Sequence, residues 1–344
     1  MKPVRLLVWG CGRIAQMFHL RHLASHGGAT VVGVADADPT NLARAAALLP
    51  GAATFHDYRE SLRVAADGVV ICLPPALHAP AAVDAFQAGF HVYLEKPLAT
   101  DLAHGEEVVG AWRCSGRLGV MGFNFRFHPR FAEARARLRE IGPLRGVQTV
   151  FTSQARTLPV WKRTREGGGG VLLDLASHHV DLMRFLFRAE VERVVAFQRT
   201  QEAEGDNAVL GLELDNGLLA QTWVSMNSVQ THRWEIFGRN GSMLIDLERP
   251  LRIEARAASW RGARIRRIAS RLRALSPREL LLAPGWEPSF GYALDAFVVA
   301  AAHGRPDATG ATILDGMRSL RVVLAAEEAV RTGAAVSVEA GEVG

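Results

Sequence analysis

Short apolar runs alternate with amphipathic segments through the first third of the chain. Runs rich in valine, isoleucine and leucine predict strands at residues 4–9, 30–35, 68–73, 91–94 and 118–122. Helical spacing of apolar residues between these runs predicts helices at 13–26, 39–49, 76–88 and 101–115. Alternation at this spacing indicates a parallel sheet with right-handed crossovers. We therefore expect an α/β fold whose N-terminal domain, residues 1–122, is a doubly wound parallel sheet of the Rossmann type.

The pattern changes beyond residue 123. Helices are predicted at 129–141 and 171–187, and strands at 144–154, 191–200, 208–214, 218–226, 233–237 and 242–247. The tripeptides Asp215-Asn216-Gly217 and Arg239-Asn240-Gly241 are typical of hairpin turns. Residues 123–344 are therefore expected to form a C-terminal α+β domain with a large, mostly antiparallel sheet.

Composition agrees with a two-domain globular protein. The chain has 344 residues, of which 49% are hydrophobic and 22% charged. No run approaches the roughly 20 apolar residues of a transmembrane helix, and the N-terminal residues predict a first strand rather than a signal peptide. The cysteines at 11, 72 and 114 have no paired spacing, so we expect neither a disulfide framework nor a zinc site. These features favour a cytoplasmic location.

The net charge of +5 is unevenly distributed. Residues 249–278 contain ten arginines and one acidic residue, so this segment carries +9 and the rest of the chain −4. General nucleic-acid binding is therefore not indicated. Three interpretations of the segment stay open: a solvated flank or subunit contact, a site for an anionic substrate, and docking to an anionic membrane or partner.

A glycine-rich turn follows the first predicted strand. Its motif is Gly10-Cys11-Gly12-Arg13-Ile14-Ala15, in which the glycines allow a pyrophosphate to approach the backbone at a helix N-terminus. The second strand ends at Asp36, where a carboxylate can accept hydrogen bonds from the adenosine ribose. This order predicts a dinucleotide site. Asp36 would repel a 2′-phosphate and favours NAD over NADP, although Arg13 keeps NADP open.

Further motifs resemble the Gfo/Idh/MocA family of glucose–fructose oxidoreductase and inositol dehydrogenase. They are Glu95-Lys96-Pro97 at the end of a strand, Leu73-Pro74-Pro75 with His78, residues 122–129, and the glycine run at 167–170 followed by Asp174 and His178. The resemblance covers nearly the whole chain. It implies an NAD(P)-dependent oxidoreductase and a C-terminal domain that binds substrate and forms a homodimer or homotetramer. It also implies a cis bond before Pro97 and cofactor contacts from Leu73, Pro74, His78, Glu95 and Lys96.

Lys96, Asp174 and His178 are the predicted catalytic residues. Lys96 ends a parallel strand, at the edge where open α/β sheets bind ligands. Asp174 and His178 are four residues apart in a predicted helix and therefore share one face. Removal of a hydride from an alcohol needs a base for the hydroxyl proton, and imidazole suits that role near neutral pH. The neighbouring His179 is expected to be structural.

The remaining candidates concern substrate and metal. Asn124 and Arg126 at the domain junction, and Trp161 and Lys162 before the glycine run, are predicted to contact a sugar-like or cyclitol-like substrate that can be anionic, with Lys162 standing where the family commonly has arginine. Tyr292 and Asp295 either close this pocket or are structural. The histidines at 19, 22 and 26 are expected to form a polar helix face, and no metal site is predicted.

The predicted reaction is hydride transfer between nicotinamide and a hydroxyl or keto carbon of a sugar, cyclitol or sugar derivative, including nucleotide-linked ones. Two alternatives stay open. One is an enzyme that holds NAD tightly and uses transient oxidation for an elimination or epimerisation. The other is a non-catalytic dinucleotide-binding sensor, which need not retain Lys96, Asp174 and His178.

Overall fold

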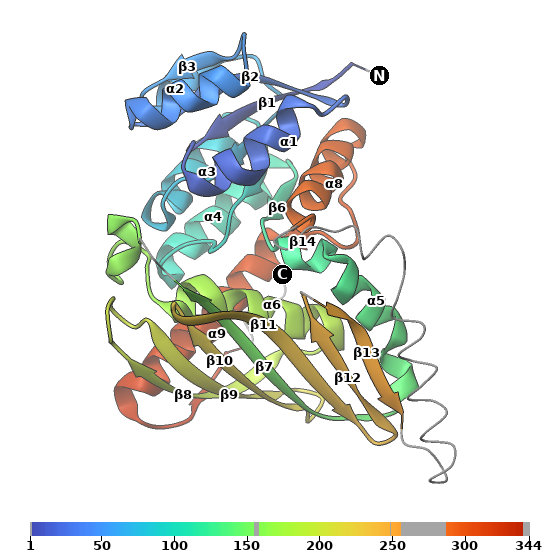
Figure 1. The fold of residues 1–344 in the computed structure, drawn as a ribbon. Coiled ribbons are helices and arrows are strands. Elements are labelled where there is room, and N and C mark those ends of the chain that lie inside the picture. Colours follow the sequence, from blue (N-terminus) through green and yellow to red (C-terminus); the bar gives the residue numbers. More distant parts are fainter. Residues whose placement is uncertain (1, 155–157, 248, 256–286, 340–344) are drawn as a thin grey trace. The chain divides into compact units, whose positions relative to one another are not determined.

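The computed structural model describes residues 2–154, 158–247, 249–255 and 287–339, and the chain divides into two compact units (Figure 1). The first unit comprises Met1–Phe127, Glu166–Gly168 and Pro288–Arg321, and the second comprises His128–Arg165, Gly169–Glu287 and Val322–Gly344. The predicted domains, residues 1–122 and 123–344, are each one continuous stretch of the chain, whereas each of these units is built from three separate stretches. Most of the arginine-rich segment 249–278 lies outside the described residues.

A seven-stranded sheet forms the centre of the first unit, in the order β14-β6-β5-β4-β1-β2-β3. Its strands are β1 (Val4–Trp9), β2 (Ala29–Ala35), β3 (Ala53–Phe55), β4 (Gly68–Ile71), β5 (His91–Leu94), β6 (Gly119–Met121) and β14 (Ala311–Thr312). All neighbours pair in parallel except β14, which is antiparallel to β6. The predicted Rossmann sheet is confirmed, with one edge strand supplied by the C-terminal part of the chain.

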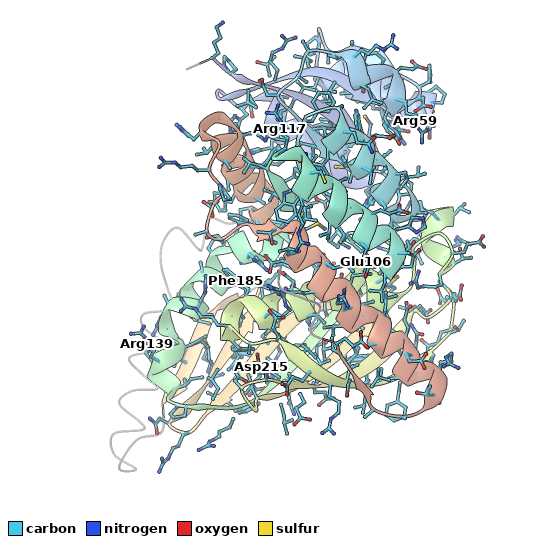
Figure 2. The ribbon with its side chains drawn as sticks, turned by 180° about the vertical axis from the view of Figure 1, so that it is seen from behind. Arg59, Glu106, Arg117, Arg139, Phe185 and Asp215 are labelled. Carbon is cyan, nitrogen blue, oxygen red and sulfur yellow. The ribbon has the colours of Figure 1, made fainter. Side chains whose placement is uncertain are left out.

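Helices connect these strands. They are the π-helix η1 (Ala15–His19), which continues as α1 (Leu20–Ala24), then α2 (Pro39–Leu48), η2 (Tyr58–Arg63), η3 (Pro75–Leu77), α3 (His78–Gln87), α4 (Leu102–Ser115), η4 (Asn124–Phe127) and α8 (Ser289–His303). Side-chain caps fix two starts: Asp38 accepts from Thr40 N, and Asp101 accepts from His104 N. On α4, Glu106 lies 3.6 Å from Arg321 (Figure 2).

The core of the first unit explains why its strands are apolar throughout. Leu6, Val8, Val34 and Val70 have no exposed surface and belong to one cluster with residues of α8, including Phe297. A parallel sheet covered on both faces requires such continuous apolar runs. Helix α8 therefore belongs to the packing of this sheet, although it comes almost 200 residues after β5.

The second unit contains an eight-stranded sheet in the order β13-β12-β11-β7-β10-β9-β8-β15. Its strands are β7 (Leu144–Gln154), β8 (Val191–Arg199), β9 (Asn207–Leu214), β10 (Leu219–Ser225), β11 (Asn227–Gly238), β12 (Gly241–Asp246), β13 (Arg249–Ala255) and β15 (Val336–Ser337). The β7–β10 pair is parallel, and the other pairs are antiparallel. The predicted mostly antiparallel sheet is confirmed.

The helices of this unit are α5 (Pro129–Arg137) with η5 (Leu138–Ile141), η6 (Val160–Arg163), and the π-helix η7 (Leu172–Ala176), which continues as α6 (Ser177–Phe187). All residues of α6 are buried. Phe185 of α6, labelled in Figure 2, has the Arg135 guanidinium of α5 3.9 Å from its ring centre. Helix α9 (Ile313–Thr332) contributes to the first unit as far as Arg321 and to the second beyond it.

The strand predictions were incomplete. Strands β3, β13, β14 and β15 were not predicted, and β11 begins at Asn227 rather than at residue 233. The polar start of β11 carries little apolar alternation, and its pairing with β7 defines it as a strand.

Candidate active site

The glycine turn after β1 has the geometry that a dinucleotide needs. Gly10 has φ of 88°, and a Cβ atom there would overlap the backbone carbonyl of Cys72. Only glycine fits this position. A Cβ atom on Gly12 would meet nothing within 4 Å, so this backbone faces open space at the start of the helix. Arg13 and Ile14 are both exposed beside it.

The Asp36 carboxylate is held in place at the end of β2. Its Oδ2 accepts a hydrogen bond of 2.6 Å from Cys11 N, and its Oδ1 accepts one of 2.9 Å from Asp38 N. Because each carboxylate oxygen has a further lone pair, both retain acceptor capacity. The two backbone donors therefore fix the plane of a carboxylate that can still accept from a vicinal diol.

Lys96 follows β5 in the same unit and is half-buried, and the Lys96–Pro97 peptide bond is cis as the resemblance implied. The preceding Glu95 is buried, and its Oε1 lies 2.8 Å from His19 Nε2. His19 has no exposed surface. The prediction that it forms part of a polar helix face is therefore wrong. No local pattern could predict this contact, because its partners are 76 residues apart.

His78 connects the loop after β4 to this strand end. Its Nδ1 lies 2.6 Å from Pro97 O, and its Nε2 lies 2.8 Å from Leu73 O. Both partners are acceptors, so the ring can donate to both only when it is protonated. Burial lowers the pKa of His78, while the two carbonyl groups and then Glu95 oppose that shift. His78 thus links the backbone of Leu73 to the backbone of Pro97. Contact of His78, Leu73 and Pro74 with the cofactor stays a prediction.

Asn124 and Arg126 hold C-terminal helices within the first unit. Asn124 is buried and donates to Ser289 Oγ at 2.7 Å. Arg126 is buried and lies 3.5 Å from the Asp315 carboxylate. These contacts give both residues a structural role, and their predicted contact with substrate stays a prediction.

In the second unit, the glycine run brings Lys162 to Asp174. A Cβ atom on Gly169 would overlap the carbonyl of Lys162, and Gly169 N donates to Thr164 O at 2.9 Å. The short helix η6 therefore packs directly on the glycine backbone. As a result, Lys162 Nζ lies 2.5 Å from Asp174 Oδ2, with the two side chains 23% and 12% exposed. Trp161, next to Lys162, is half-buried.

Asp174 and His178 lie on one continuous helix, but not on regular α-helical turns. Asp174 belongs to the π-helix η7, and His178 is the second residue of α6. Such π-turns are frequent at functional sites because they shift the direction of side chains. Both residues are buried, with 9% and 8% exposure. The His178 ring meets the edge of Phe151 with centres 6.1 Å apart.

His179 packs into the sheet, as its expected structural role requires. Its Nδ1 lies 2.8 Å from Thr149 Oγ1 and 2.9 Å from Thr222 Oγ1, and its Nε2 lies 3.1 Å from His232 Nε2. Burial, and then the neighbouring His178, holds the pKa of His179 well below its usual range. These contacts with β7, β10 and β11 set the rotation of α6 about its axis.

Comparison with known proteins agrees with this geometry. Residues 4–123 match the model of an oxidoreductase family with an NAD-binding Rossmann fold, and residues 131–244 match the GFO/IDH/MocA C-terminal domain. Inositol 2-dehydrogenase 2 of Saccharopolyspora erythraea is 30% identical over 346 residues, which cover 96% of this chain and 94% of that protein. The chain belongs to the Gfo/Idh/MocA oxidoreductase family.

Two further proteins are similar to this chain. A dTDP-3,4-didehydro-2,6-dideoxy-alpha-D-glucose 3-reductase of Streptomyces violaceoruber is 30% identical, with 72% of this chain and 73% of that protein covered. The crystal structure of the WlbA dehydrogenase from Bordetella pertussis in complex with NADH and UDP-GlcNAcA has a TM-score of 0.82 and 23% identity, covering 98% of each chain. No helix in the described part of the chain is long and apolar enough to span a membrane.

Within this Gfo/Idh/MocA chain the predicted catalytic residues are divided between the units. Lys96 belongs to the first unit, and Asp174 and His178 belong to the second. The structure brings Lys162 to Asp174, and Asp36 to the glycine turn. His19 was missed as a partner of Glu95, since its signal in the sequence is only a histidine four residues into the first helix.

Proposed function

We propose that the protein transfers a hydride between NAD(H) and a hydroxyl or keto carbon of a sugar, cyclitol or sugar derivative. The observation that carries this proposal is the contact of Lys162 with Asp174, on the helix that continues to His178. A half-buried ammonium and a buried carboxylate offer donors and an acceptor to a polyol, and the imidazole that follows offers a base. Family membership supplies the redox class.

The residues of the first unit fit NAD. Gly12 opens space at the start of the first helix, where backbone N–H groups and the helix dipole favour a pyrophosphate. The fixed carboxylate of Asp36 fits the ribose diol and repels a 2′-phosphate. When bound, NAD supplies the nicotinamide carbon that accepts or donates the hydride.

The proton moves separately from the hydride. In the oxidative direction His178 removes the proton from the reacting hydroxyl, and in reduction it returns that proton to the oxygen. Lys96, at the end of β5, supplies an ammonium that stabilises negative charge developing in the reaction. Asp174, oriented by Lys162, accepts a hydrogen bond from a neighbouring substrate hydroxyl.

A rate screen tests the proposed function. Wild-type protein, Lys96→Ala and His178→Ala are assayed for NADH formation with polyols, inositols, aldoses and nucleotide sugars. His104→Ala is the matched control, because His104 is an exposed histidine of the first unit. We expect turnover of at least one substrate, a loss of about 100-fold or more in the two active-site variants, and no change in the control. Equal turnover in all four proteins would exclude these roles, and failure to bind NADH would exclude the whole assignment.

Cofactor choice is tested by binding. We expect NADH to bind at least about tenfold more tightly than NADPH, since Asp36 places a carboxylate where the extra phosphate would lie. Asp36→Asn keeps the shape of the side chain without its charge and is expected to narrow that preference. A wild-type preference for NADPH would reverse the assignment.

A further inference from the structure

Three potential metal ligands meet on the surface of the first unit, outside the groups used above. His22 lies in α1, His26 follows the end of that helix, and Asp295 lies in α8 (Figure 1). Asp295 Oδ1 is 2.5 Å from His22 Nε2 and 3.1 Å from His26 Nε2. One potential ligand atom from each residue lies within 4.8 Å of the other two. In the described part of the chain, no other three histidine, cysteine, aspartate or glutamate side chains meet this condition.

Packing between α8 and the first helix holds these residues together. Phe290 of α8 stacks on Phe18 with ring centres 4.2 Å apart and an angle of 14° between the planes. Gly291 leaves room for the His22 ring, because a Cβ atom there would come within 3.1 Å of it. The three ligands are therefore set by a ring stack and by a close helix contact, rather than by a chance meeting of long surface side chains.

The donor set fits a transition-metal ion. Imidazole nitrogen and carboxylate oxygen bind Zn²⁺ at about 2.0–2.2 Å, which places tetrahedral ligand atoms about 3.4 Å apart. Reaching that spacing from the observed separations of 2.5 and 3.1 Å moves the side-chain atoms by less than about 1 Å. His26 Nδ1 accepts a hydrogen bond of 3.0 Å from Gly28 N, and metal binding through Nε2 replaces this contact because the ring proton then lies on Nδ1. The His22, His26 and Asp295 side chains are 32%, 16% and 42% exposed, so an ion can enter and water can occupy a fourth position.

We propose that His22, His26 and Asp295 form a Zn²⁺ site that links the end of α1 to α8. With three protein ligands and one water, it would join segments 273 residues apart in sequence. The positions of the histidines at the C-terminal end of the first helix also favour a cation, because the helix dipole is negative there. This proposal differs from the prediction made from the sequence, in which these histidines form a polar helix face and no metal site is present.

The site is independent of the proposed hydride transfer. Gly12 directly precedes the first helix, whereas His22 lies in α1 near the C-terminal end of that helix, ten residues further along the chain. Zn²⁺ at this position would therefore stabilise the fold of the first unit and would not contact the cofactor pyrophosphate at the other end of the helix. Its loss can be separated experimentally from a loss of NADH binding.

Calorimetric titration of the full-length, tag-free protein with ZnCl2, after chelator treatment, tests the proposal. We expect one Zn²⁺ per chain and a rise in Tm when it binds. His26→Gln and Asp295→Asn are expected to weaken binding by at least about 100-fold, since each removes a ligand. His104→Ala is the matched control: His104 Nδ1 lies 2.6 Å from Asp101, an exposed pair without a third ligand, and this variant should bind Zn²⁺ as the wild type does.

Co²⁺ supplies a second readout that does not depend on stability. An ion held by two imidazoles and a carboxylate in a near-tetrahedral arrangement absorbs strongly in the visible range, and Zn²⁺ should remove this absorption by displacement. Retained NADH binding by the variants would show that they are folded. Failure of wild-type protein to bind Zn²⁺, or equal Zn²⁺ affinity in Asp295→Asn and wild type, would overturn the proposal. The three side chains would then be only a carboxylate in contact with two imidazoles.

Discussion

Replacement of Lys162 by methionine isolates the contact on which the proposed substrate site depends. The variant keeps the length of the side chain and removes the charge that lies 2.5 Å from Asp174 Oδ2. A hydrogen bond to a charged group contributes about 1.5–3 kcal/mol. Loss of one partner of a fully buried ion pair costs about 3–5 kcal/mol. The Lys162 and Asp174 side chains are 23% and 12% exposed, so we expect a smaller cost for this pair. At about 1.4 kcal/mol per tenfold, we expect kcat/KM to fall by about 10- to 150-fold.

Steady-state rates with a substrate found in the screen measure this effect. Lys162→Arg is the matched variant because it retains a cation, and it should recover most of the loss. Asp174→Asn should lose about as much as Lys162→Met, and the double variant should lose less than the product of the two single losses, since both remove one interaction. A Lys162→Met protein with unchanged Tm and a kcat/KM within about twofold of wild type would refute the reasoning.

Three further predictions concern the first helix turn, a helix cap and the cysteines. Gly10→Ala should lower the free energy of unfolding by about 2–4 kcal/mol in denaturant titration, because φ is 88° and a Cβ atom there would overlap the backbone of Cys72. Gly12→Ala should keep the wild-type free energy of unfolding and lose NADH affinity. A Gly12→Ala protein that binds NADH normally would contradict the cofactor assignment. His128 caps α5, because its Nδ1 accepts a hydrogen bond of 3.1 Å from Arg130 N. Burial lowers the pKa of His128 to about 4, so the unfolded chain takes up the proton first and stability falls as the pH drops from about 6.5 to about 4. His128→Asn keeps a capping acceptor and should show a shallower fall in Tm, and an unchanged slope would count against this cause. Burial, then Asp36, raises the pKa of Cys11 to about 12, so mass spectrometry after alkylation of the native protein should find the exposed Cys114 modified before Cys11.

Local patterns were sufficient for much of the fold. The apolar run at Val4–Trp9 and the run at Leu144–Gln154 form strands with the predicted bounds. Both are long enough for their periodicity to be visible without knowledge of their partners. Strand β14 is different, because Ala311–Thr312 is only two residues long and exists through its pairing with β6. A pattern within a short window contains no information about such a pairing.

The candidate site shows the same difference. The glycine turn and Asp36 are neighbours through adjacent parallel strands, so their proximity follows from the predicted topology. The role of His19 depends on Glu95, and those of His22 and His26 depend on Asp295, which arrives with α8. Because the helix periodicity around these histidines is compatible with an exposed face, only the tertiary contacts distinguish a buried hydrogen bond from a polar surface.

Isotope tracing distinguishes net hydride transfer to NAD from transient oxidation of the substrate. A substrate found in the screen is prepared with deuterium on the carbon that bears the reacting hydroxyl, and the NADH produced by wild-type protein is analysed by mass spectrometry. We expect one deuterium in each NADH formed, and the corresponding keto compound as product. Deuterium that stays in the product, or that is lost to water without NADH release, would contradict it and would favour transient oxidation by a retained cofactor.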